Sequence, residues 1–258
     1  MKVVLFCGGL GTRLRDYSDS VPKPMVPIGP RPVMWHVMKY YAHYGHREFV
    51  LCLGYRGDLI KDYFLRYEET TSNDFVLTSG GREVRLLASD IEDWKITFVD
   101  TGQHTNVGER LLAVRQHLHG EEFFLANYAD GLTDLCLPDY ISFAATKNTT
   151  ATFMAVRPPL SLHVARFDAD GYATDVTPIR KADLWVNAGY FVLRHDIFDH
   201  IGIGEDLVEE PFHRLIERRQ ACAYGYEGFW RAMDTFKDKQ ALDEMYERGP
   251  APWEVWRR

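Results

Sequence analysis

Residues 2–14 read KVVLFCGGLGTRL, and this run determines the fold prediction. The apolar stretch Lys2–Cys7 has the length and composition of a buried strand. The glycines that follow it, Gly8, Gly9 and Gly11, allow the backbone to turn closely around a ligand. Backbone N–H groups in such a loop point at anions, above all at phosphates. The stretch therefore predicts an α/β protein with a phosphate site at the carboxyl end of its first strand.

Two basic residues follow the loop at a short spacing. Arg13 carries a forked guanidinium that can bind two phosphate oxygens, and Lys23, between Pro22 and Pro24, can place a point charge on them. The loop differs from a dinucleotide-binding turn because Leu14 stands at the third glycine position, and it lacks the Gly-Lys-Ser/Thr of a Walker A loop. The combination of loop, Arg13 and Lys23 favours a nucleotide phosphate site over a structural turn.

Strand and helix patterns alternate along the first half of the chain, which indicates a Rossmann-like, mainly parallel sheet with helices on both faces. The predicted strands are Lys2–Cys7, Phe49–Leu53, Lys95–Asp100, Phe123–Ala126 and Thr152–Val156, and the predicted helices are Val33–Tyr44, Asp58–Tyr67, Glu109–His117 and Pro138–Thr146. The second half adds a hairpin over Ala165–Thr177, a strand over Trp185–Leu193 and helices near Glu209–Arg218 and Lys237–Arg248. The polar stretch Glu68–Gly81 is expected to form an irregular surface excursion or lid. We expect one domain, 1–258.

Composition narrows the classes of partner. The chain has 258 residues, 46% of them hydrophobic, and a formal net charge of −7, so general affinity for nucleic acid or for an anionic membrane is not expected. The four cysteines are far apart and form no CxxC pair, which is typical of a protein in a reducing compartment. The apolar N-terminal run is short and no 18-residue apolar run follows. We therefore expect a cytoplasmic protein.

The glycine-rich loop and Pro22-Lys23-Pro24 resemble the signature of the sugar-phosphate nucleotidyltransferases. Further segments make the chain similar to the glucose-1-phosphate cytidylyltransferase branch; they are Trp35-His36, His43-Tyr44-Gly45, Gly54-Tyr55, Val99–Gly102, Gly108–Leu111, Asn187, Gly228–Trp230, Met233–Thr235 and Ala251–Trp253. The resemblance implies a Rossmann-like core, CTP as the nucleotide donor, dependence on Mg²⁺ and a homo-oligomer. It also divides the chain into a nucleotide-binding half, 1–157, and a half, 158–258, that holds a small β-rich acceptor-side extension and the C-terminal helices.

Asp130 and Asp234 are the candidate Mg²⁺ ligands. Mg²⁺ prefers one or two carboxylates together with substrate phosphates and water, so two aspartates from distant segments suffice. Asp130-Gly131 by itself is more typical of a turn. The metal role of both residues therefore rests on the phosphate loop and on the resemblance.

The reaction that the resemblance implies needs no enzyme nucleophile. A phosphate oxygen of the acceptor attacks the α-phosphorus of the NTP in line, and pyrophosphate leaves. The catalytic residues would be Arg13, Lys23, Asp130 and Asp234. The nucleotide would be held by Gly8, Gly9, Gly11, Thr12, Arg13, Lys23, Gly102, Arg110 and Asp130. Arg110 would lie near the base, and the alternative for it is an exposed helix arginine.

The acceptor half departs from the family pattern. Relatives carry a Glu-Lys-Pro segment whose lysine binds the acceptor phosphate, whereas residues 175–181 read DVTPIRK. Relatives also place a Gly-Arg-Phe-Gly turn where residues 160–163 read LSLH. The candidate acceptor-binding residues are Asn187, His163, Arg180 and Lys181. We therefore expect glucose 1-phosphate to be a poor acceptor and another sugar phosphate, or a phosphorylated non-sugar, to be the substrate. A nucleotide-binding regulatory protein without catalysis is the alternative.

Overall fold

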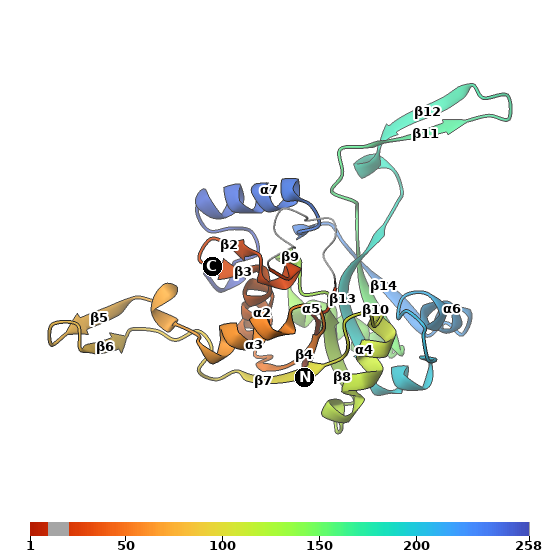
Figure 1. The fold of residues 1–258 in the computed structure, drawn as a ribbon. Helices are drawn as coiled ribbons and strands as arrows, with labels where there is room; N and C mark the ends of the chain where they lie inside the picture. The colour runs from red at the N-terminus through yellow and green to blue at the C-terminus, as the bar shows by residue number, and fades with distance from the viewer. Residues whose placement is uncertain (10–20, 258) are drawn as a thin grey trace.

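The centre of the molecule is a mixed sheet of seven strands in a computed structural model that describes residues 1–9 and 21–257. The strand order is β14-β10-β13-β8-β1-β4-β7 (Figure 1). In chain order these strands are β1 (Val3–Phe6), β4 (Glu48–Leu53), β7 (Lys95–Asp100), β8 (Phe123–Asn127), β10 (Ala151–Val156), β13 (Val186–Arg194) and β14 (Ala221–Tyr226). The predicted α/β fold with a mainly parallel sheet is confirmed.

Strand direction places most carboxyl ends at one edge of the sheet. β1 runs parallel to β4 and to β8, β4 runs parallel to β7, and β10 runs parallel to β14. β13 is antiparallel to both of its neighbours, β8 and β10. The carboxyl ends of β1, β4, β7, β8, β10 and β14 therefore meet the start of β13 at a single edge. In α/β sheets this edge is where ligands bind.

Helices cover both faces of the sheet (Figure 1). In β1, Val3 and Leu5 pack into the cluster that contains α2 (Val33–His43) and α5 (Leu137–Lys147). Val4 and Phe6 point the other way, into the cluster that contains α4 (Val107–Val114) and α6 (Glu210–Glu217). Burial on both faces explains why this strand reads as a continuous apolar run instead of an alternating one.

The remaining helices pack on the side of α2. α3 (Gly57–Leu65) contributes Ile60 to that cluster and α7 (Phe236–Glu247) contributes Leu242. A capping box at the start of α7, with the Thr235 side chain accepting from the N–H of Asp238, fixes the first turn of this helix. Asp234 directly precedes the cap residue Thr235, so the cap also helps to fix the backbone position of this aspartate. A second capping box, between Asn106 and Glu109, begins α4 in the same way.

Two hairpins project from opposite sides of the body (Figure 1). One, β11 (His163–Phe167) with β12 (Ala173–Pro178), confirms the predicted hairpin of the acceptor-side extension. The other, β5 (Phe75–Thr78) with β6 (Glu83–Leu86), corrects the expectation that Glu68–Gly81 is irregular throughout. The polar composition of the surrounding residues masked the short apolar strand Phe75–Thr78.

Smaller elements complete the fold. β9 (Gly131–Thr133) pairs with β15 (Trp230–Ala232), and β2 (Pro27–Ile28) pairs with β3 (Arg31–Pro32). Short 3-10 helices are η1 (Lys23–Met25), η2 (Glu69–Thr71), η3 (Arg115–Leu118), η4 (Ile179–Lys181), η5 (His195–Asp199) and η6 (Val255–Arg257). Within the described ranges, no helix has both the length and the apolar character that a membrane crossing requires.

Candidate active site

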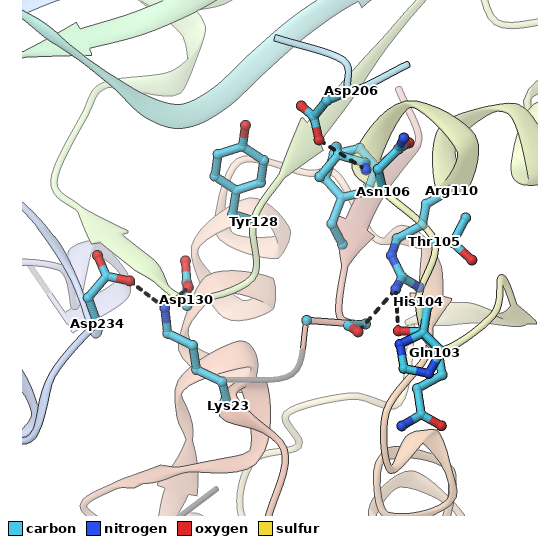
Figure 2. Close-up of a pocket in the computed structure, with 14 residues that line it drawn as sticks. Lys23, Gln103, His104, Thr105, Asn106, Arg110, Tyr128, Asp130, Asp206 and Asp234 are labelled. Carbon is cyan, nitrogen blue, oxygen red and sulfur yellow. Dashed lines mark hydrogen bonds and ion pairs between the residues drawn. The ribbon is translucent and has the colours of Figure 1, made fainter. Parts of the chain in front are cut away.

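Lys23 brings two distant aspartates together. Its ammonium lies 2.5 Å from Asp130 Oδ2 and 2.6 Å from Asp234 Oδ1 (Figure 2). Lys23 begins η1 directly after Pro22, Asp130 precedes β9, and Asp234 precedes α7. The β9–β15 ladder continues into this contact, because the N–H of Met233 donates to the carbonyl of Asp130 at 3.0 Å. The structure thus joins the three residues that the sequence singled out.

The cluster is partly shielded from solvent. The Lys23 and Asp130 side chains are each 17% exposed, and that of Asp234 is 48% exposed. Burial lowers the pKa of Lys23, but the adjacent Asp130 and Asp234 carboxylates raise it above its ordinary value overall. The ammonium therefore stays charged at neutral pH. The two carboxylates on either side of this ammonium form an acidic pair that can attract a divalent cation.

The two carboxylates fit a magnesium ion whose coordination shell is completed by phosphate oxygens of the substrate. Among the described residues, no group of three or more His, Cys, Asp and Glu side chains gathers as a metal site. Asp130 and Asp234 supply two carboxylates, which is the protein contribution that Mg²⁺ usually has at phosphate-transfer sites. A site of this kind needs phosphate oxygens for its remaining ligands.

A sharp turn after β8 positions Asp130. Ala129 adopts a left-handed conformation with φ 64°, which costs about 1–2 kcal/mol for a residue with a Cβ. The Asn127 side-chain oxygen accepts a 2.8 Å hydrogen bond from the Ala129 N–H and holds this turn. The turn ends the strand and leaves Asp130 beside Lys23.

A cavity of about 520 Å³ lies between the first loop and the start of α4. Its lining residues are Phe6, Gly8, Gly9, Lys23, Gln103, His104, Thr105, Asn106, Val107, Arg110, Tyr128, Asp130, Asp206 and Asp234. A Cβ at Gly8 would lie 2.0 Å from Nη1 of Arg110, so a larger residue there would displace the Arg110 guanidinium. The volume is within the range of small-molecule sites. The cavity joins the acidic pair to the glycine-rich loop.

Arg110 is buried in the wall of this cavity, where its residue is 4% exposed. Its guanidinium donates to the carbonyl oxygens of Gly8 at 3.1 Å and Leu53 at 3.1 Å, and to Thr101 Oγ1 at 2.7 Å. A longer bond of 3.4 Å reaches the carbonyl of Gln103. Arg110 is therefore not an exposed helix arginine: it ties together the ends of β1, β4 and β7. Its contact with a nucleotide base stays a prediction.

The other predicted nucleotide residues lie at the same edge where the structure describes them. Gly9 lines the cavity, and Gly102 turns the chain after β7 with φ 93°, immediately before the cavity-lining Gln103. Gly11, Thr12 and Arg13 lie outside the described residues. Their predicted roles are therefore untested.

The predicted acceptor residues separate into two groups. Asn187, near the start of β13, places its Nδ2 3.5 Å from the hydroxyl of Tyr128, which lines the cavity. His163, Arg180 and Lys181 lie on or beside the β11–β12 hairpin, are exposed, and do not line the cavity. The structure does not bring these three to Lys23. Their acceptor-binding role stays a prediction.

Sequence reasoning missed six polar side chains of the cavity: Gln103, His104, Thr105, Asn106, Tyr128 and Asp206. Tyr128 lies two residues before Asp130, and this proximity was a usable signal. Burial raises the pKa of the Tyr128 hydroxyl, so it remains a hydrogen-bond donor at neutral pH. His104 and Asp206 stand in loops without a motif. Only the approach of the segment before α6 to the start of α4 places Asp206 there, with its Oδ2 3.5 Å from the N–H of Val107.

Known proteins resemble this chain both in sequence and in fold. The nucleotidyl transferase family model matches residues 2–238. A probable glucose-1-phosphate cytidylyltransferase of Bacillus subtilis is 38% identical over 258 residues, which are 99% of this chain and 100% of the relative. The glucose-1-phosphate cytidylyltransferase of Salmonella typhi is 37% identical over 262 residues, again 99% of this chain and 100% of the relative. Among solved structures, a UDP-glucose pyrophosphorylase from Acinetobacter baumannii shares the fold, with a TM-score of 0.70, 19% identity and coverage of 99% of this chain and 97% of the other.

The two full-length relatives and the family model agree with the resemblance that the glycine-rich loop and Pro22-Lys23-Pro24 indicated. Because the match extends over nearly the whole chain, it covers both the loop and the segments that carry Asp130 and Asp234. The chain belongs to the nucleotidyl transferase family, and within it to the sugar-phosphate nucleotidyltransferases.

Proposed function

We propose that this protein transfers CMP from CTP to a sugar phosphate and releases pyrophosphate. The observation that carries the proposal is the Lys23 ammonium between Asp130 and Asp234, beside Gly8 and Gly9 at the carboxyl edge of the sheet. CTP as the donor rests on the two cytidylyltransferases that match the whole chain.

The residues of the chain bind and orient the two substrates. The backbone around Gly8 and Gly9 admits the triphosphate, Lys23 neutralises the α-phosphate, and Asp130 and Asp234 hold the metal. Mg²⁺, when bound, neutralises phosphate charge as a Lewis acid. An acceptor phosphate oxygen forms the new bond to the α-phosphorus while the bond from that phosphorus to the β-phosphate oxygen breaks. Positioning and charge stabilisation supply the catalysis.

The test is release of pyrophosphate from CTP, UTP, dTTP, ATP and GTP with a panel of sugar phosphates that includes glucose 1-phosphate. We expect CTP to have the highest kcat/KM. Tighter binding of another NTP in competition calorimetry, together with faster turnover of it, would contradict the choice of donor. A protein that binds CTP but releases no pyrophosphate with any acceptor would instead support the regulatory alternative.

We also propose that the chain forms a homo-oligomer through its β5–β6 hairpin. Phe75, Leu77, Val84 and Leu86 share one face of the β5–β6 hairpin, because Phe75 pairs with Leu86 and Leu77 with Val84. This face is open to solvent, with Leu77 56% and Val84 52% exposed. An isolated two-stranded hairpin is at best marginally stable in water, so an apolar face of this kind needs a cover. A second copy of the chain is the proposed cover.

Light scattering coupled to size exclusion tests the assembly. Leu77→Asp should lower the molar mass of the particle, whereas Arg85→Asp, on the opposite face of the same hairpin, should leave it unchanged. A monomeric wild-type protein at micromolar concentration would contradict the proposal.

A further inference from the structure

A second cavity lies at the same edge of the sheet, near the ends of β10 and β14. Its volume is about 350 Å³, and Arg157, Pro159, Tyr226 and Trp230 are among the residues that line it. Arg157 directly follows β10. The cavity is distinct from the one that contains Lys23, because the two share no lining residue.

Two contacts hold the Arg157 guanidinium in place and leave some of its N–H donors for other partners. Its guanidinium stacks on the Trp185 ring, 4.5 Å from the centroid, and Nη1 donates to the carbonyl of Ala182 at 2.8 Å. Two exposed carboxylates, Asp183 and Glu227, lie at 3.8 Å and 3.9 Å, beyond hydrogen-bond distance. Exposed pairs of this kind contribute little. Within the described ranges Nη2 has no hydrogen-bond partner, so one arm of the fork is available to a ligand.

Trp230 lines this second cavity and also lies close to the residue that follows Asp130. Its indole Nε1 donates to the carbonyl of Ala188 at 3.0 Å and lies 3.2 Å from where a Cβ on Gly131 would stand. Gly131 immediately follows Asp130. A residue that lines the second cavity thus packs against the chain directly after Asp130.

Sheet order sets the distance between the two sites. β10 is separated from β8 by β13, so its end lies two strand spacings, or about 10 Å, from the end of β8. Arg157 and the turn that carries Asp130 therefore stand at separate positions along this edge. A ligand that contacts both has to extend beyond the phosphate that reacts beside Lys23.

We propose that Arg157 binds a second anionic group of the acceptor, a carboxylate or a phosphate, remote from the phosphate that reacts. The inference rests on the proposed transfer of CMP to a sugar phosphate. A guanidinium pre-ordered by stacking presents a planar fork to such oxygens. His163, Arg180 and Lys181 line neither cavity, so among the basic residues considered for the acceptor Arg157 has the position that fits. The acceptor is accordingly a sugar phosphate with an acidic substituent.

The test compares three acceptors with CTP by release of pyrophosphate: glucose 1-phosphate, glucuronic acid 1-phosphate and glucose 1,6-bisphosphate. Glucuronic acid 1-phosphate adds a carboxylate and glucose 1,6-bisphosphate adds a second phosphate, so the comparison shows which of the two anions the site prefers. We expect kcat/KM for one of the acidic acceptors to exceed that of glucose 1-phosphate by roughly 10- to 100-fold, the range of one charged hydrogen-bonded contact. Arg157→Met should remove this preference and change the glucose 1-phosphate value less than about threefold.

A matched control is Arg66→Met, because Arg66 is also paired with an exposed carboxylate, at the far end of α3. It should keep the wild-type preference. If Arg157 only fixes the loop around Ala182, Arg157→Met will lower kcat/KM for all three acceptors equally and lower the melting temperature, which overturns the proposal. A wild-type enzyme without preference for either acidic acceptor overturns it as well.

Direct binding separates this inference from the proposed function. Calorimetry measures the affinity of glucuronic acid 1-phosphate and of glucose 1,6-bisphosphate for wild type and for Arg157→Met. Binding of either that weakens at least tenfold in the variant supports the anion site, even if no acceptor yields pyrophosphate and the proposed function fails. Equal affinities for wild type and variant refute the anion site, whatever the turnover with CTP.

Discussion

Replacing Lys23 with methionine is expected to move metal affinity and turnover in opposite directions. The Lys23 ammonium occupies the space between Asp130 and Asp234, where a divalent cation would bind. Methionine keeps most of the length of the side chain and removes the charge. The two carboxylates then lose their counter-ion, and the empty enzyme should attract a divalent cation more strongly than wild type does.

The structure sets the size of this effect. With Lys23 Nζ 2.5 Å from one carboxylate oxygen and 2.6 Å from the other, these oxygens are separated by no more than about 5 Å, and two charges at that distance repel by about 3 kcal/mol at an effective dielectric constant near 20. A bound cation relieves this repulsion. We therefore expect Mn²⁺ to bind nucleotide-free Lys23→Met roughly 10- to 100-fold more tightly than wild type, since about 1.4 kcal/mol corresponds to a factor of ten.

Free Mn²⁺ is measured by electron paramagnetic resonance during titration of the nucleotide-free protein. In the same variant, turnover with CTP should fall by about 10²- to 10³-fold, because a preorganised charge at the α-phosphate is lost. Lys39→Met is the control, since Lys39 Nζ pairs with Asp90 at 2.8 Å in a different part of the molecule. Mn²⁺ affinity that is unchanged or weaker in Lys23→Met would refute the idea that the ammonium and the metal compete for one place.

Three further predictions follow from other contacts. Asp234→Asn should abolish Mg²⁺-dependent turnover and weaken Mn²⁺ binding by at least about tenfold, and full turnover of wild type in excess EDTA would contradict the metal role. Arg110→Met should lower the free energy of unfolding in urea by about 2–4 kcal/mol, because buried oxygens at the ends of three strands lose their donor; an unchanged midpoint would leave Arg110 with no structural role. Burial lowers the pKa of His36 to about 4, and its neutral ring donates from Nε2 to the Ile28 carbonyl and accepts at Nδ1 from Trp253 Nε1. The unfolded chain binds this proton near pH 6.5, so stability present above that pH should decline by about 2 kcal/mol at pH 5; an equal decline in His36→Gln between pH 7 and pH 5, measured by urea midpoints, would argue against it.

Much of the central sheet could be predicted from the sequence because the governing signals are local. The continuous apolar run of β1 reflects burial on both faces, and the alternation of strand and helix patterns indicates parallel pairing. Gly8 and Gly9 after that strand indicated where a phosphate would approach. Two signals were too weak: β14 contains Gly225 and small residues, and β5 is a four-residue strand within a stretch of polar composition.

The sequence by itself determined the class of fold and singled out the glycine-rich loop, Lys23, Asp130 and Asp234 as candidates. Only the tertiary structure decided that these three side chains meet: the β9–β15 ladder brings Asp130 and Asp234 together, and Lys23, 211 positions from Asp234, reaches both with its ammonium. It also decided that the hairpin basic residues stay outside both cavities and that Arg157 faces the second one. The physical reason is that side-chain periodicity and glycine conformation act over a few residues, whereas the distance between two groups at a sheet edge depends on which strands become neighbours.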